Sequence, residues 1–328
     1  MRAGDWWDFK LVPILSAFYA TALMLGVAVS SLWLPALTLL LSIIACAAYV
    51  SLINDVTDRR EDAAAGKPNR IEGRSALVKA AMLAVPIIAG FGFVILWRDD
   101  PLLVMLYLGA WVAFALYSLP PFRFKARGIL GVLADASGAH LFPTLLAVMI
   151  ACRGANRIVS LGWIVAVGTW AFACGVRGIL WHQLVDLRSD ALIGARTFAQ
   201  RYSAHTVSRL GTFVIFPLEV AALAVLLWQL SDAASIVMLV VYGAFAVART
   251  SRMGVSNVIV VPKPRYRTVM NEYYECFLPI ALLGASALRH PGDWLVLAIH
   301  LVLFRERPRQ ILIDAWQTVR VGREARRI

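Results

Sequence analysis

Charged residues and cysteines are both scarce in this sequence. Only 16% of the 328 residues are charged, whereas 60% are hydrophobic. The four cysteines lie in apolar sequence, without the spacing of a metal site or a disulfide framework. We interpret them as small core residues: Cys46, Cys152, Cys174 and Cys276. Low-complexity linkers and soluble-domain boundaries are also missing, which predicts one membrane-embedded domain over residues 1–328.

The N-terminus and the distribution of charge argue against a signal peptide and against nucleic-acid binding. We expect no cleavable signal peptide, because Asp5 and Asp8 precede a hydrophobic run too long for the core of such a signal. The net charge is +12, but the basic residues gather between apolar segments. We therefore expect the protein to bind no nucleic acid and to lie in the lipid bilayer.

Apolar segments recur along the whole chain. Runs of about 20 apolar residues are typical of helices that cross a bilayer, so the sequence predicts an all-α polytopic membrane protein. The ten segments are roughly 11–30, 32–53, 76–97, 101–119, 129–151, 158–185, 209–230, 233–248, 271–288 and 293–304. The last is short for a span and could instead lie in the membrane interface.

Lysine and arginine are concentrated in alternate connections between these segments. The basic connections are 54–74, 120–128, 186–209, 249–270 and the tail after Phe304. Because cytoplasmic loops carry the excess of Lys and Arg, we expect the N-terminus and all these connections to face the cytoplasm.

The first basic connection begins with regularly spaced oxygen-bearing side chains. Asn54, Asp58 and Asp62 are four residues apart, so on an α-helix they share one face. Such ligands suit a hard cation such as Mg²⁺, which keeps several waters and shares its shell with substrate phosphates. Basic residues follow, as an anionic ligand requires: Arg59, Arg60, Lys67, Arg70 and Arg74. Taken alone, the stretch could equally be a solvated loop of mixed charge.

A second stretch repeats this arrangement after the sixth apolar segment. His182, Asp186 and Asp190 are again four residues apart. Asp62 and Asp190 are each followed by a glycine after four residues, and a basic residue comes soon after. The two stretches end the second and sixth segments, which suggests a duplicated four-helix unit. Two such stretches make unrelated charged loops a poor explanation.

These stretches resemble the signature motifs of the UbiA superfamily of intramembrane prenyltransferases. The matching residues are Asn54-Asp55-x-x-Asp58-x-x-x-Asp62 with Asn69-Arg70 and Gly73-Arg74 behind it, Asp186-x-x-x-Asp190 with Gly194 and Arg196-Thr197, Tyr117 with the run Pro120–Lys125, and Lys10-x-x-Pro13. The sequence departs from the family at Ile71, where a proline often stands, at His182, and in its tenth apolar segment.

The resemblance implies a barrel of about nine transmembrane helices, possibly with a short tenth, and the transfer of a prenyl group from a Mg²⁺-bound prenyl diphosphate. The acceptor would be aromatic or otherwise lipophilic, and the motifs leave its identity open. A terpene cyclase on the same scaffold would use the same metal site. A transporter of a divalent ion or phosphate is a third class, but it predicts ionisable residues along a path at bilayer depth. Most acidic residues here gather at one membrane face, which favours an enzyme over a transporter.

The chemistry assigns roles to individual residues. Mg²⁺, or Mn²⁺ in its place, would act as a Lewis acid on the departing diphosphate, with Asn54, Asp58 and Asp62 holding one ion and Asp186 and Asp190 a second. Candidate contacts to the diphosphate are Lys67, Arg70, Arg123, Lys125 and Arg196. Each of them could instead belong only to the excess of basic residues that marks cytoplasmic loops. Arg177 could reach the substrate or pair with Asp186. Aromatic faces attract an allylic cation, and the candidates are Tyr117, Trp181 and Tyr19.

Other ionisable residues lie inside the apolar segments, where they usually face a cavity or a partner. Asp135 and His140 could deprotonate an acceptor, or form a structural hydrogen bond between helices. Glu219, Glu272 and Glu275 lie in later segments, and residues 271–275 could cover the site. Small residues that could form the floor of the prenyl chamber are Gly138, Gly168 and Gly175.

Overall fold

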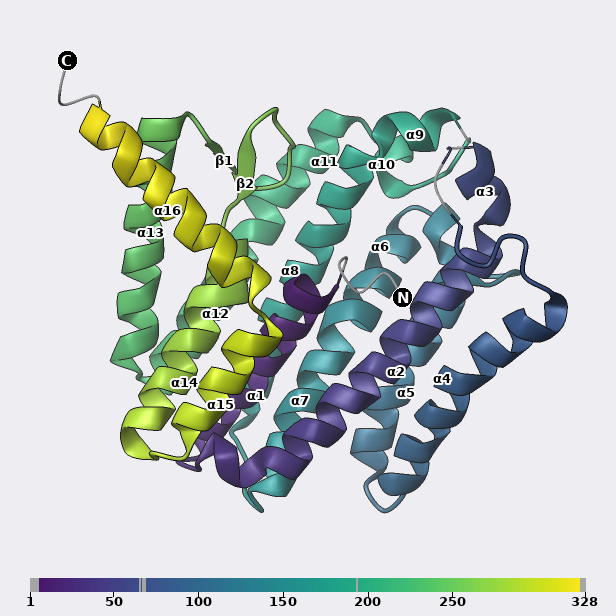
Figure 1. The fold of residues 1–328 in the computed structure, drawn as a ribbon. Coiled ribbons are helices and arrows are strands. Elements are labelled where there is room, and N and C mark those ends of the chain that lie inside the picture. Colours follow the sequence, from purple (N-terminus) through teal and green to yellow (C-terminus); the bar gives the residue numbers. More distant parts are fainter. Residues whose placement is uncertain (1–5, 65, 67–68, 193, 325–328) are drawn as a thin grey trace.

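The structure is a computed structural model, and it describes residues 6–64, 66, 69–192 and 194–324. Its helices run side by side in one bundle, as Figure 1 shows. Within the described ranges the only strands are β1 (Ser256–Val258) and β2 (Tyr266–Thr268), which pair in parallel within one connection between helices. The predicted all-α polytopic fold class is confirmed.

Seven helical segments are long and apolar enough to cross a membrane. They coincide with the second to eighth apolar segments of the sequence, as the thickness of a bilayer requires. The helices that form them are α2 (Trp33–Thr57), α4 (Ala76–Leu96), α5 (Pro101–Ser118), α6 and α7 (Ile129–Ala136 and Phe142–Gly154), α8 (Leu161–Val185), α11 and α12 (Ala204–Leu210 and Phe216–Leu230) and α13 (Ala233–Met253).

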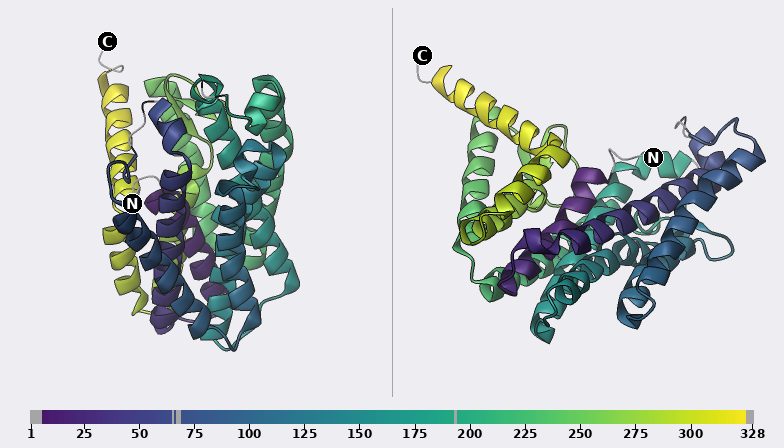
Figure 2. Two further views of the ribbon diagram at one scale, coloured as in Figure 1. Left: turned by 90° about the vertical axis from the view of Figure 1, so that its right-hand side faces the viewer. Right: turned by 60° about the horizontal axis from the view of Figure 1, so that its bottom comes forward.

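The other three apolar segments form shorter helices. These are α1 (Val12–Met24), α14 (Leu278–Arg289) and α15 (Asp293–Leu303), the last with 11 residues. The chain then forms α16 (Glu306–Glu324), a charged helix that the sequence analysis did not predict. In Figure 1 α16 runs obliquely beside α13, and in both views of Figure 2 it lies at the outside of the bundle.

Four helices begin with a π-turn, and proline explains each one. A π-turn of 5 residues precedes α1, α7, α12 and α14, and the second residue of each of these helices is a proline: Pro13, Pro143, Pro217 and Pro279. Proline donates no backbone hydrogen bond, and its ring clashes with the carbonyl four residues earlier. The wider turn relieves that clash and bends the helix.

The ends of α2 and α8 match closely, which supports the predicted duplication. Each helix has 25 residues, each is capped by an aspartate, and each leads into a helix of 6 residues, α3 (Arg59–Ala64) or α9 (Leu187–Leu192). Figure 1 places α3 and α9 at the same end of the bundle, with α10 (Phe198–Arg201) beside α9. The fold therefore brings the two acidic motifs to one end of the protein.

Candidate active site

A cavity of about 460 Å³ joins the two acidic motifs to an apolar interior. Its polar mouth, at the end where α3 and α9 lie, is lined by Asn54, Asp58, Asp62, His182, Asp186 and Asp190. Its apolar walls include Ile14, Ile43, Cys46, Leu106, Ala110 and Leu146. A helix rises 1.5 Å per residue, so Leu106 lies about 18 Å along α5 from the end of that helix. The second, fourth, fifth and sixth apolar segments line this chamber, and the first segment joins them.

The first motif keeps one helical face through the bend between α2 and α3. The amide of Asp58 donates to the carbonyl of Asn54 at 2.9 Å, and the amide of Asp62 donates to the carbonyl of Asp58 at 2.7 Å. Side-chain partners then fix the orientation. Ser118 donates to the amide oxygen of Asn54 at 2.5 Å, and Asn69 donates to the carboxylate of Asp62 at 2.9 Å.

The second motif has the same backbone geometry. The amide of Asp186 donates to the carbonyl of His182 at 2.9 Å, and that of Asp190 donates to the carbonyl of Asp186 at 2.8 Å. Thr197 donates to the carboxylate of Asp190 at 3.4 Å. Thr197 follows Asp190 by the same seven residues that separate Asn69 from Asp62. The fold thus holds two equivalent carboxylate stripes, with His182 in the place of Asn54.

A glycine turn follows each stripe for the same conformational reason. Gly66 and Gly194 have φ angles of 63° and 65°, in the left-handed region that side chains with a Cβ rarely adopt. The amide of each glycine donates to the carbonyl three residues earlier, in the short helix, at 3.2 Å. The following residues can therefore return to the acidic side chains, as Asn69 and Thr197 do.

Two basic residues of the connection after α5 contact the first motif. Lys125 forms ion pairs with Asp58 and, at 3.0 Å, with Glu61. Arg123 pairs with Glu61 at 2.6 Å and approaches Asp58 to 3.6 Å. These contacts offset the repulsion between carboxylates on neighbouring turns. Lys125 lines the cavity, whereas Arg123 does not.

The other predicted phosphate contacts are placed differently. Arg196 lines the cavity mouth from the connection after α9. Arg70 is exposed and does not line the cavity. Lys67 lies outside the described residues.

Comparison with known proteins identifies the family to which this arrangement belongs. The UbiA prenyltransferase family matches residues 13–257. The chain belongs to this family. The seven apolar helical segments and the family together make it an integral membrane protein.

The similar proteins agree with this assignment. Two Humulus lupulus proteins named 2-acylphloroglucinol 4-prenyltransferase, one of them chloroplastic, are each 28% identical over 212 residues, which is 61% of this chain and 49% of theirs. The chain thus spans about half the length of these relatives. A UbiA homolog from Archaeoglobus fulgidus, solved with GPP and Mg²⁺ bound, matches 89% of this chain and 100% of its own with a TM-score of 0.52 and 14% identity. That likeness shows a shared fold.

Arg177 of this UbiA protein does not reach the cavity, contrary to one prediction. Its guanidinium forms two hydrogen bonds with Glu219, at 2.6 and 2.9 Å, and a third with Asn271 at 2.9 Å. Both charged side chains are fully buried. Tyr274 donates to Glu219 as well, at 2.9 Å. Arg177 therefore ties α8 to α12 and to Asn271, two residues before the π-turn that precedes α14.

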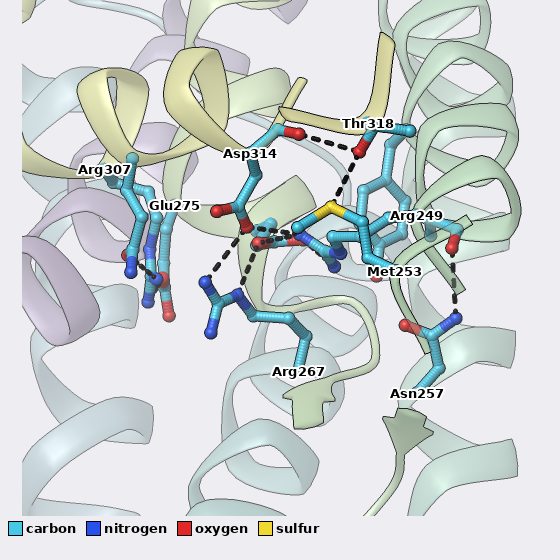
Figure 3. A network of polar contacts seen from close by, with 12 residues as sticks. Arg249, Met253, Asn257, Arg267, Glu275, Arg307, Asp314 and Thr318 are labelled. Carbon is cyan, nitrogen blue, oxygen red and sulfur yellow. Dashed lines mark hydrogen bonds and ion pairs between the residues drawn. The ribbon is translucent and has the colours of Figure 1, made fainter. Parts of the chain in front are cut away.

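Two further glutamates also form structural ion pairs rather than covering the site. Arg249 forms paired hydrogen bonds of 2.8 Å with Glu272, and Asp314 of α16 contacts the same arginine at 3.2 Å. Figure 3 shows Arg249 and Asp314 together with Glu275, which pairs with Arg307 of α16. These pairs attach α16 to the last helices of the bundle.

Tyr117 is the one predicted aromatic residue that lines the cavity. Tyr19 instead lies 3.3 Å from a ring nitrogen of His300, within the core, and Trp181 packs against His182 and Tyr266. The structure adds three aromatic residues to the cavity wall: Trp6, Tyr107 and Phe114. Nothing in the local sequence separates Tyr107 and Phe114 from other aromatic residues of the spans, and Trp6 lies before the first apolar segment.

Of the three glycines predicted to form the chamber floor, only Gly138 lines the cavity. A Cβ there would lie 3.0 Å from the ring of Phe114, close to the mouth end of α5. Gly175 instead allows close packing, because a Cβ would lie 2.9 Å from the backbone of Ala136. Gly168 meets Leu141 and Leu145 at ordinary contact distances. The floor must be set elsewhere.

Four polar residues of the cavity wall were not predicted from the sequence: Ser51, Glu61, Gln183 and Ser189. Glu61 could have been found, because it lies one helical turn after Asp58 and shares its face. Gln183 lines the cavity while its side-chain oxygen accepts from the amide of Ala199 at 3.0 Å. No sequence signal separates Gln183 from other polar residues near the second motif.

Proposed function

We propose that this UbiA protein is a Mg²⁺-dependent intramembrane prenyltransferase, which ionises a prenyl diphosphate and transfers the isoprenoid to an aromatic or other lipophilic acceptor. The observation that carries the proposal is that one cavity has both carboxylate stripes at its mouth and apolar walls behind them. A prenyl diphosphate has the same division, with a highly charged head and an apolar tail.

The donor set at the mouth suits a metal ion shared with a diphosphate. Within the described ranges, no three His, Cys, Asp or Glu side chains could enclose an ion by themselves. Mg²⁺ commonly binds through one or two carboxylates and completes its shell with waters and substrate phosphates. Asn54, Asp58 and Asp62 would hold one ion, and Asp186 and Asp190 a second. Bound there, Mg²⁺ supplies Lewis-acid stabilisation of the departing diphosphate.

The basic residues provide fixed positive charge at the same place. Lys125 and Arg196 line the cavity beside the carboxylates, where each can donate charge-assisted hydrogen bonds to diphosphate oxygens. When the diphosphate binds, Lys125 would pair with it instead of with Asp58. The Asp58 carboxylate would then be available to a cation. Tyr117 presents a ring to the cavity close to the end of α5, where it can stabilise an allylic cation.

The similar proteins support the substrate classes. The Archaeoglobus fulgidus structure contains GPP and Mg²⁺, which favours a prenyl diphosphate and that metal. The Humulus lupulus relatives are named for prenylating 2-acylphloroglucinol, which favours an electron-rich aromatic acceptor. The excess of Lys and Arg beside the mouth favours its placement on the cytoplasmic side, together with the N-terminus.

Cyclisation of the prenyl chain itself is the second candidate. The rings of Trp6, Tyr107, Phe114 and Tyr117 all line the cavity, and aromatic walls suit a migrating cation. The two reactions differ in their products, because only transfer consumes an acceptor.

One experiment tests both candidates. The purified protein is incubated with labelled geranyl, farnesyl or geranylgeranyl diphosphate, alone and with host lipid extract or an acylphloroglucinol. Transfer predicts a labelled product that appears only when an acceptor is present and Mg²⁺ is supplied. Cyclic hydrocarbons formed without any acceptor would establish cyclisation instead. Intact donor under every condition would refute both.

A further inference from the structure

Asp135 lies at the junction between the polar mouth and the apolar chamber. It is on α6, within a segment long and apolar enough to cross the membrane, and it lines the cavity. A π-turn, Ser137–Leu141, follows directly, and two of its residues, Gly138 and Ala139, also line the cavity. Such turns occur frequently at functional sites.

Asp135, which is half-buried, differs from the three buried glutamates of the later helices. Glu219, Glu272 and Glu275 are each neutralised by an arginine. Across residues 6–64, 66, 69–192 and 194–324, by contrast, Asp135 has neither a hydrogen bond nor an ion pair. A carboxylate inside a membrane span is costly and usually marks function when the protein does not neutralise it.

The surroundings of Asp135 match the position of the reacting carbon. With the diphosphate at the acidic motifs and the tail among the apolar walls, the first carbon of the prenyl group lies at the junction between them. Asp135 is close enough to Tyr117 to interact with it electrostatically, and both side chains line this junction.

His140, the other ionisable residue of this segment, is placed differently. It does not line the cavity, and its ring packs against Gly175 of α8. Of the two residues that the sequence left as candidates to deprotonate an acceptor, only Asp135 therefore lines the cavity.

We propose that Asp135 is the catalytic base that removes the acidic proton of a phenolic or enolic acceptor; this rests on the proposed prenyl transfer. The bond from the first prenyl carbon to the diphosphate oxygen breaks first, and a ring carbon of the acceptor then forms a bond with the resulting allylic cation. The diphosphate leaves with the electron pair of the broken bond, and the acceptor proton passes to a carboxylate oxygen of Asp135. Atoms and charge balance without an oxidant or a further reactant.

The test compares Asp135→Asn with Asp135→Glu and the parent protein. Prenylated product and released diphosphate are measured separately, with labelled prenyl diphosphate and host lipid extract. General base catalysis is typically worth about 10²–10⁴-fold, so Asp135→Asn should lower product formation by about 100-fold or more. Diphosphate release should fall less, because the acidic motifs remain intact, and Asp135→Glu should recover part of the product.

Thermal stability separates this role from a structural one. Asparagine has nearly the same shape and removes an unpaired charge, so Asp135→Asn should melt at the parent temperature or above it. Asp99→Asn, at a carboxylate that is 94% exposed outside the spans, is the matched control and should change neither activity nor melting.

The possible failures are distinguishable. Parent-like product formation by Asp135→Asn overturns the role of Asp135 alone. A lowered melting temperature with proportionate loss of product and diphosphate release shows a structural carboxylate and overturns it too. A parent protein that prenylates no acceptor refutes the proposed function, and the role of Asp135 falls with it.

Discussion

Ala110→Leu should shorten the longest prenyl diphosphate that the protein accepts. Ala110 lines the cavity from α5, is 3% exposed, and stands eight residues before the end of that helix, about 12 Å along its axis. Hydrophobic attraction cannot set chain length here, because a tail that leaves the chamber enters lipid rather than water. Steric exclusion remains, and forcing extra carbons into a packed site costs about 1–3 kcal/mol.

That cost predicts a selective loss of about 5–150-fold in kcat/KM for the longest donor. Geranyl diphosphate, which does not reach as deep, should keep the parent value, and the metal requirement should not change. The assay is competition between geranyl, farnesyl and geranylgeranyl diphosphates in one mixture. Gly168→Ala is the control, because its new Cβ meets Leu141 at 3.4 Å, an ordinary contact away from the cavity. An unchanged chain-length profile in Ala110→Leu, with the protein folded, would refute this placement of the chamber.

Three other predictions concern the metal, the orientation and the stability of the protein. Asp58→Ala and Asp186→Ala should each abolish diphosphate release without lowering the melting temperature, as EDTA should in the parent; full turnover in any of the three would contradict the metal site. Cysteines placed at positions 72 and 192, in a background without the native four, should react only with a reagent applied from the cytoplasmic side, and labelling from opposite sides would rule out one shared mouth. Arg249→Met should lower the free energy of unfolding by up to about 3–5 kcal/mol, because buried Glu272 loses its paired hydrogen bonds and keeps only the partly exposed Arg267, at 3.4 Å; Arg98→Met, at a side chain 73% exposed, is the control, and equal melting of the two variants would contradict the prediction.

The features that sequence could predict are those set by local spacing and by the bilayer. Ten apolar runs were recognisable because a membrane requires about 20 apolar residues per span. Asn54, Asp58 and Asp62 were predicted to share a face because four residues nearly complete one helical turn, and the structure keeps that face despite the bend at Asp58.

Pairings between distant helices could not be predicted in the same way. Arg177 meets Glu219, 42 residues further along the chain, because helix packing and the π-turn before α12 set which face of α12 carries Glu219 toward α8. Helix packing and the π-turn after Asp135 likewise decide that Asp135 faces the cavity while His140 does not. The helix α16 was missed because it lacks an apolar run and is held by ion pairs with residues on other helices.

The π-turn after Asp135 has a consequence for the geometry of that span. Phe142 donates to the carbonyl of Ser137, five residues earlier, so the turn contains one residue more than an α-helix would use. One residue corresponds to about 100° of rotation about the helix axis. The two halves of the span, α6 and α7, are therefore offset in azimuth. The half toward the mouth can therefore direct a carboxylate into the cavity while the other half packs its own face against α1 and α5. A substitution in one half can change catalysis or packing without changing the other.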